Sequence, residues 1–598
     1  MVVRHVHSVV HRGDAEATTL IVALHGCTWW SRSRRSQLQY VVAAIRQVRP
    51  DADVMTPLLP IEFWSLQDAN RVVSELLRVV DRQWNQRAKD GRPYSRVVLV
   101  GFSFGSVLTR ALYCRAAGTR RDGTVNERIA RPWAQRVERI VLIAGLNRGW
   151  TTDSPVSRLK ALSNNLGTAF AHLLPVKPTL FAIRRGAPFL TQTRLQWLAL
   201  REQARLPALT IQLLGTRDDI VSPMDNIDLA TGDDFLYLEV PQSGHFDVIQ
   251  MGEDDIGLQR RSRFVDALTG SRASLTPIAV TGSDLLHLLP VGADPSSELI
   301  SRAQPGRVVD DVVFVVHGIR DKGYWTRKVA RLVSVTGQSK GLTVVAVAPS
   351  YGYFALLPFL LPWMRRDKVE WLLDMYVAVR SLYPDARVSF IGHSNGTYIL
   401  AGAIESCRPV RFHNVVFAGS VVRSSFQWRR YLRRKQVGRV LNYVATADWV
   451  VAIFPRFLQN LKLQDVGGAG HDGFSDGSSP ITDVEYVPGR HGAAIEERHW
   501  QDIAAFVLGG DPPDKQDTAR HWLVVLAGHL AFVVWLFLGA VALLPLYALL
   551  VGLGFPELTG WTWLAHWQKH AATSPPAWVT AGALVAWLRV LTVALTRL

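Results

Sequence analysis

The chain has 598 residues, a formal net charge of +17 at pH 7 and an apolar share of 48%. This length exceeds what one hydrophobic core organises, and the apolar share excludes a largely disordered chain. Because no zinc-finger spacing or RNA-binding aromatic motif accompanies the charge, we expect no nucleic-acid partner and interpret the charge as suited to an anionic membrane surface. The three cysteines, Cys27, Cys114 and Cys407, lie far apart, so reduced thiols and no metal site are expected.

The N-terminal sequence MVVRHVHSVVHRG has no apolar run long enough for a signal peptide, so we expect the body of the chain on the cytoplasmic side. Two short apolar runs, residues 20–24 and 312–316, are each followed directly by His-Gly. Continuous apolar runs of this length are typical of strands buried on both faces of a parallel sheet. They predict an α/β fold, with the same pattern occurring twice.

Each His-Gly pair is followed at nearly the same distance by a Gly-x-Ser-x-Gly turn. His25 precedes Ser103 in GFSFG by 78 residues, and His317 precedes Ser394 in GHSNG by 77. Both turns lie between a predicted strand and a predicted helix, which is where a nucleophilic serine projects from a sheet. The matched intervals indicate a duplicated domain.

A developing oxyanion at such a serine needs backbone N–H donors. The residue after each serine supplies one, from Phe104 or Asn395, and the loop after each His-Gly supplies another. In the first repeat this donor is Cys27 or Thr28, and in the second it is Ile319. No histidine is predicted to pair with Cys27 as its base, which disfavours a nucleophilic role for this residue.

Serine needs a histidine base, and the histidine needs a carboxylate to orient it. In the first repeat, Asp218 after the run 210–214 is preferred to Asp219, and His245 after the run 235–240 is the predicted base. In the second repeat, Asp448 is the predicted acid. His491 is preferred as base because it follows a strand-like run ending in Val-Pro, as His245 does; the alternatives are His471 and His499.

This set of motifs resembles the lipase- and esterase-like members of the α/β-hydrolase superfamily. The resemblance covers roughly residues 15–270 and 305–510 and implies ester hydrolysis through an acyl-enzyme, with no cofactor. It departs from the family pattern in its tandem arrangement and its apolar tail. The predicted architecture is therefore two tandem α/β-hydrolase domains at residues 1–270 and 307–510, a linker at 271–306 and a membrane region at 511–598.

Two insertions are candidates for substrate contact. The first repeat spends 115 residues between Ser103 and Asp218, and its surplus at 146–207 is predicted to form a cap over the active site. The second repeat has an aromatic and apolar stretch at 351–363. This stretch is either a buried connection, or an acyl-chain pocket or membrane-touching loop.

The tail is predicted to anchor the chain in a membrane. Residues 522–553 contain no Asp, Glu, Lys or Arg. This stretch is longer than the roughly 20 residues that span a bilayer. Residues 577–598 form a second apolar stretch around Arg589, either a further transmembrane helix or a helix lying in the interface. The function expected is a membrane-tethered serine hydrolase of lipid or other hydrophobic acyl esters; the alternatives are acyl transfer by the same triad and a scaffold with one or both domains non-catalytic.

Overall fold

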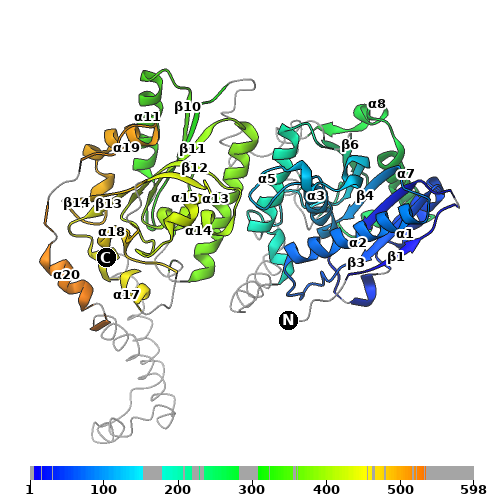
Figure 1. Ribbon diagram of the computed structural model, residues 1–598, viewed down its shortest axis with the longest axis horizontal. Coiled ribbons are helices and arrows are strands. Elements are labelled where there is room, and N and C mark those ends of the chain that lie inside the picture. Colours follow the sequence, from blue (N-terminus) through cyan, green and yellow to red (C-terminus); the bar gives the residue numbers. More distant parts are fainter. Residues whose placement is uncertain are drawn as a thin grey trace, which may run out of the picture.

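A computed structural model describes residues 6–533, apart from residues 15, 30, 35, 152–177, 207–208, 219–225, 227, 229, 231–234, 282–307, 322, 355–358, 360, 454, 461–464, 477–479, 515–517, 520 and 531. These residues form two sheets that lie beside one another, each flanked by helices (Figure 1). The second predicted apolar stretch, 577–598, and most of the first lie outside the described residues.

The first sheet has the strand order β1-β3-β2-β4-β5-β6-β7-β8. Its six central strands are parallel, and the edge strands β1 and β8 pair antiparallel to their neighbours. The strands are β1 (His7–His11), β2 (Thr19–Leu24), β3 (Ala52–Leu58), β4 (Arg96–Phe102), β5 (Val137–Ile143), β6 (Leu209–Gly215), β7 (Phe235–Val240) and β8 (Val280–Thr281).

The second sheet has the order β10-β9-β11-β12-β13-β14, and all of its pairings are parallel. If the strands of each set are numbered from one to six along the chain, this sheet and the six central strands of the first sheet have the same order: second, first, third, fourth, fifth, sixth. The strands are β9 (Asp311–Val316), β10 (Val344–Val347), β11 (Arg387–His393), β12 (Phe412–Ala418), β13 (Val437–Ala445) and β14 (Ile481–Val487). The described chain therefore has an α/β architecture in which one sheet topology occurs twice.

Apolar side chains alternate between the two faces along each strand, so both faces of each sheet are apolar and are covered by helices. In β2, Leu20, Val22 and Leu24 join one buried cluster while Ile21 and Ala23 join another. The first cluster includes residues of α2 (Ala69–Lys89), α3 (Phe104–Ala116) and α5 (Pro188–Glu202), and the second includes residues of α1 (Gln39–Val48) and α7 (Asp255–Thr269). In the second sheet, α13 (Pro362–Leu382) and α14 (Asn395–Ser406) cover one face, and α11 (Tyr324–Ser339) and α19 (Trp500–Val507) cover the other.

The two units meet through α5 and α13, which lie between the sheets (Figure 1). Leu195 and Leu198 of α5 belong to the same buried cluster as the core of the second unit. The described part of the insertion at 146–207, which was predicted to form a cap over the active site, has a different position. α5 packs on α3 and on α13, so it builds the contact between the units, while residues 152–177 lie outside the described residues.

The boundaries of the predicted linker and tail also differ from the observed elements. Residues 271–281, expected to begin the linker, contribute α8 (Arg272–Leu275) and the edge strand β8 to the first unit. The tail begins with α20 (Trp522–His529), which projects from the second unit at the lower left of Figure 1. Within the described part of the chain, no helix is both long and apolar enough to span a bilayer.

Candidate active sites

Ser103 and Ser394 adopt the same uncommon backbone conformation. Ser103 has φ 51° and ψ −122°, and Ser394 has φ 52° and ψ −118°. Each follows the carboxyl end of a central strand, β4 or β11, and immediately precedes the helix α3 or α14. Positive φ is unfavourable for a residue with a Cβ, and such conformations cost about 1–3 kcal/mol and concentrate at functional sites.

The surroundings fix both turns in the same way. The N–H of Ser103 donates to the carbonyl of Ile143 on β5, and that of Ser394 donates to Ala418 on β12, both at 2.9 Å. Each serine carbonyl also accepts from a hydroxyl three residues later, Ser106 Oγ at 2.5 Å or Thr397 Oγ1 at 2.7 Å. The strained serine is thus held by its neighbouring strand and by the first turn of its own helix.

Glycines are required around each serine because backbone atoms approach closely. A Cβ at Gly105 would lie 2.5 Å from the carbonyl oxygen of His25, and a Cβ at Gly396 would lie 2.7 Å from that of Val316. A Cβ at Gly26 would lie 2.9 Å from the Cβ of Ser103, and one at Gly318 would lie 2.7 Å from that of Ser394. The His-Gly pairs therefore serve to bring a loop against each serine.

The structure brings the first predicted triad together. Ser103 Oγ lies 2.8 Å from His245 Nε2, and His245 Nδ1 lies 3.0 Å from Asp218 Oδ2. With a proton on Nδ1, the histidine donates to the carboxylate and accepts from the serine hydroxyl. All three side chains are nearly buried. Asp219, the alternative acid, lies outside the described residues.

A buried histidine and a glutamine position the loop beside Ser103. His25 donates from Nδ1 to the carbonyl of Gly26 and accepts from the N–H of Leu59, and burial lowers the pKa of His25 to about 4, so it stays neutral. Gln37 accepts from the N–H of Gly26 at 2.8 Å and donates to the carbonyl of Cys27 at 3.3 Å. Burial raises the pKa of the Cys27 thiol to about 11, which disfavours a thiolate nucleophile there.

Aromatic side chains border the first site. Trp29 follows the Cys27–Thr28 loop and stacks on Phe63, with ring centroids 4.7 Å apart; Phe246 follows His245. Trp29, Trp64 and Phe246 are all more than half exposed. The N–H of Phe63 donates to the carbonyl of Thr28 at 2.9 Å, so this rim is fixed to the predicted oxyanion loop.

The second site has its acid and base in contact. His491 Nδ1 lies 2.9 Å from Asp448 Oδ2, and the N–H of Val451 donates to Asp448 Oδ1 at 3.0 Å. Burial acts to lower the pKa of His491, but the charge and hydrogen bond of Asp448 outweigh it and raise the pKa above its ordinary value. Among the described residues, Ser394 Oγ makes no hydrogen bond to His491.

Tyr351 is a site residue that the motifs did not reveal. Its ring stacks on His317 at 4.4 Å between centroids, and its hydroxyl lies 2.8 Å from the carbonyl oxygen of Gly318. The amide of Asn395, the predicted oxyanion residue, also donates to this hydroxyl, at 3.3 Å. Tyr351 and Phe354 are buried, whereas residues 355–358 and 360 of the 351–363 stretch lie outside the described residues. The described beginning of that stretch thus forms part of the site wall.

The alternative bases for the second site have other surroundings. His471 lies buried in the short helix α18 (Ala469–Asp472), and His499 lies beside the ring of Tyr443 at 5.6 Å between centroids. Asp448 bonds His491 rather than either of them. No group of three or more metal-ligating side chains occurs among the residues that the structure describes.

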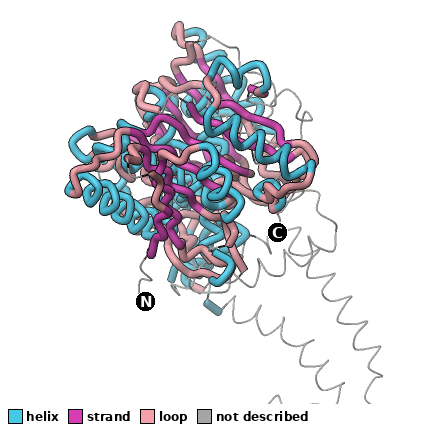
Figure 2. Tube along the Cα trace, turned by 90° about the vertical axis from the view of Figure 1, so that its right-hand side faces the viewer, coloured by secondary structure: helices cyan, strands magenta, loops and turns pink. Residues whose placement is uncertain are grey.

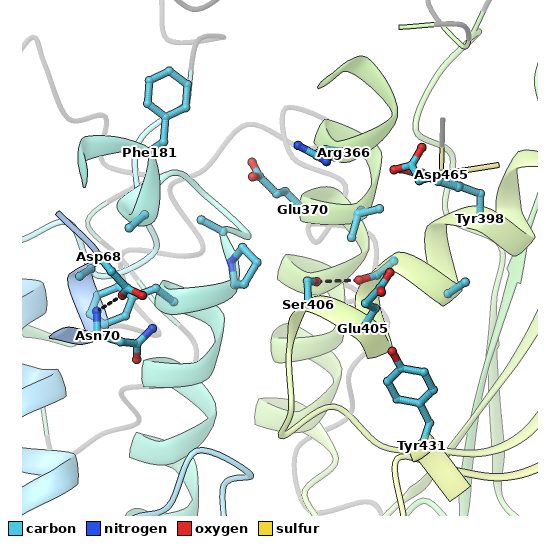
Figure 3. Close-up of a pocket in the computed structure, with 18 of the residues that line it drawn as sticks. Asp68, Asn70, Phe181, Arg366, Glu370, Tyr398, Glu405, Ser406, Tyr431 and Asp465 are labelled. Carbon is cyan, nitrogen blue, oxygen red and sulfur yellow. Dashed lines mark hydrogen bonds between the residues drawn. The ribbon is translucent and has the colours of Figure 1, made fainter. Parts of the chain in front are cut away.

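A cavity of about 910 Å³ is lined by residues of both units (Figure 3). Asp68, Asn70 and Phe181 line it from the first unit, and Glu370, Tyr398 and Tyr431 line it from the second. Because no triad residue lines this cavity, its size alone does not mark it as the catalytic pocket.

The search for relatives gives structural likeness only. No protein-family model matches the chain, and no curated protein matches it either. Solved structures similar to it include a carboxylesterase of the thaumarchaeon Nitrososphaera gargenis, with 15% identity, a TM-score of 0.27 and coverage of 46% of this chain and 95% of that one. An α/β serine hydrolase without a lid from Xanthomonas campestris has 16% identity, a TM-score of 0.25 and coverage of 45% and 89%. A thermophilic esterase from Thermogutta terrifontis has 14% identity, a TM-score of 0.27 and coverage of 44% and 95%.

Proposed function

We propose that this chain is a membrane-tethered serine hydrolase that cleaves carboxylic esters of hydrophobic acyl groups at two sites. The observation that carries this proposal is the pair of serines with matching φ and ψ, each at a strand-to-helix turn with a histidine–aspartate pair in the same unit. A tight turn without chemistry has no need of this strained conformation or of a buried acid–base pair beside it.

The geometry of the first site supports a reaction through an acyl-enzyme. Ser103 Oγ attacks the ester carbonyl while its proton passes to His245 Nε2, and Asp218 stabilises the imidazolium that results. The N–H groups of Phe104 and of Cys27 or Thr28 stabilise the oxyanion. The imidazolium then protonates the departing alkoxide, and water, deprotonated by His245, hydrolyses the acyl-serine. In the second site, Ser394, His491, Asp448, Asn395 and Ile319 have the same roles.

Labelling with a fluorophosphonate probe tests this proposal, because the probe forms a stable phosphonyl-serine only with an activated hydroxyl. The full-length protein in detergent is labelled, digested and mapped by mass spectrometry. We expect adducts at both Ser103 and Ser394, and we expect the Ser103→Ala, Ser394→Ala double variant to lose both labelling and hydrolysis of acyl esters. Ester hydrolysis that persists in the folded double variant would contradict the proposal.

Ligand binding without turnover is a second candidate for the second site alone. Its Ser394 makes no hydrogen bond to His491 in the described structure, in contrast to the 2.8 Å contact in the first site. Catalytic hydrogen bonds are often long without substrate, so this difference does not by itself exclude catalysis. Labelling of Ser103 with no labelling of Ser394 would favour this second candidate over catalysis at the second site.

A further inference from the structure

Helix α20 exposes an apolar face to solvent. Trp522 is 68% exposed and Leu523 is 49% exposed, and Leu526 is exposed as well. At about 100° per residue, these three side chains lie within one stripe of the helix. Gly528 faces the opposite way: a Cβ there would lie 2.5 Å from Arg456 Nη1 and 3.7 Å from Ala452 Cβ. The sequence of α20, WLVVLAGH, has no charged residue that would solvate the outer face.

The start of α20 is bonded to the loop that carries the acid of the second site. The N–H of His521 donates to the carbonyl of Thr446, two residues before Asp448, at 3.1 Å. α20 also packs on α16 (Trp449–Ile453), the helix that follows Asp448 directly. An N–H of this helix holds the acid, since that of Val451 donates to the Asp448 carboxylate at 3.0 Å.

The same loop contacts the segment that carries the base. The N–H of Gly489 donates to Thr446 Oγ1 at 3.1 Å, and the N–H of Ala447 donates to the carbonyl of Gly489 at 2.9 Å. Gly489 lies two residues before His491. A short bonded path therefore joins α20 to both Asp448 and His491.

We propose that the exposed face of α20 docks on a lipid bilayer and holds the second site at the bilayer surface, where it takes acyl esters that reside in the membrane. A bilayer is favoured over a second protein copy because the sequence from Trp522 to Leu553 contains no Asp, Glu, Lys or Arg, and this stretch is longer than the roughly 20 residues needed to span a membrane. The inference rests on the proposed function for its substrate and on the exposed stripe for its docking surface.

Fluorescence quenching tests the docking surface. A Leu523→Cys variant carrying an environment-sensitive fluorophore is reconstituted as the full chain in phosphatidylcholine vesicles that contain brominated lipid. Val335→Cys, on α11 of the same unit, is the matched control, because Val335 is an apolar residue of similar exposure, 53%. We expect at least threefold quenching at residue 523 and none at residue 335. Equal quenching at both residues would overturn the inference. Protection of residue 523 from quenching that increases with the protein-to-lipid ratio would also overturn it, because it would indicate that a second copy of the chain covers this face.

Probe labelling tests the consequence for the second site. A Leu523→Glu, Leu526→Glu variant is labelled in vesicles with a long-chain fluorophosphonate inserted in the lipid, and Ser103 serves as the internal control. We expect labelling of Ser394 to fall about tenfold and labelling of Ser103 to change less than twofold, with little change at either serine in detergent. Equal losses at the two serines would overturn the inference. If Ser394 is unlabelled even in the parent protein, the proposed catalysis at that site is wrong, and the quenching experiment alone decides the docking surface.

Discussion

Gly26 allows the loop after β2 to approach Ser103 closely, because it has no Cβ. An alanine there places its Cβ 2.9 Å from the serine Cβ and about as close to the ring of Phe102, so the serine or the loop must move. Because a displacement of about 1 Å can cost about 100-fold in rate, we expect Gly26→Ala to lower fluorophosphonate labelling of Ser103 about 100-fold and to leave Ser394 unaffected.

Gly252→Ala is a matched control for this substitution. The nearest atom to its Cβ is a carboxylate oxygen of Asp254 at 3.0 Å, at the end of a side chain that can move. Labelling of Ser103 that is reduced equally by both substitutions would show that general destabilisation, and not the approach of Gly26 to the serine, is responsible.

The His491–Asp448 pair makes a prediction about pH. Burial disfavours the charged imidazolium, but Asp448 favours it more, so the pKa of His491 lies above 6.5, its ordinary value. The protonated histidine cannot accept the proton of Ser394, and the second site therefore gains activity as the pH rises through that pKa. We expect the rate of Ser394 labelling to rise with a midpoint above pH 6.5. A midpoint at or below 6.5, measured under conditions where the protein stays folded, would contradict this assignment of the base.

At the scale of elements, local sequence was sufficient for the strands and turns that carry Ser103 and Ser394 and for the contact of Ser103 with His245. The pairing of Ser394 with His491 stays a prediction. Local constraints on the backbone come from the apolar runs before His25 and His317 and from the glycines around Ser103 and Ser394. Such constraints can be predicted from short stretches of sequence. The role of α5 was not readable, because its burial depends on α13, which lies far away in the sequence. Tyr351 was missed for the same reason: its contacts with His317 and Asn395 arise only from the fold.

The contact between α5 and α13 contains a buried charge network. Asp374 of α13 lies 2.6 Å from Arg194 of α5 and 2.7 Å from Arg148, and Arg194 also bonds Asp228 at 2.6 Å. Burial acts to raise the pKa of Asp374, but the two arginines hold that pKa far below its usual range. Asp374 is the carboxylate through which the second unit binds both of these arginines of the first.

Asp374→Asn should therefore be strongly destabilising. It leaves two buried guanidinium groups with reduced compensation, and breaking a buried ion pair from one side costs about 3–5 kcal/mol. Asp367→Asn is the control, since Asp367 is partly exposed and pairs with Arg184 at 2.9 Å, a type of pair worth at most about 1 kcal/mol. The measurement is the shift of the urea unfolding midpoint of the full chain in detergent. Similar shifts for the two variants would show that the network does not hold the units together.

For the whole molecule, the shared strand order and the shared serine conformation favour descent of the two units from one duplicated domain. Among the described residues, the edge strands β1 and β8 occur only on the first sheet, so the two sheets differ at their edges while their other six strands have the same order. The two units also meet through helices that do not correspond to one another. α13 corresponds in chain order to α2, whereas α5 comes from the insertion after β5, for which the described part of the second unit has no matching long helix.

This asymmetric contact predicts that the first unit does not fold stably alone. Residues 1–306 expressed by themselves would expose Leu195 and Leu198 and leave Arg148 and Arg194 without Asp374. A newly exposed apolar surface favours aggregation. We expect this fragment to aggregate, and to become soluble and labelled at Ser103 when it is co-expressed with residues 307–598. Size-exclusion chromatography with probe labelling checks both expectations. A monodisperse fragment 1–306 with full labelling at Ser103 would show instead that the two units are independent enzymes joined only by the chain.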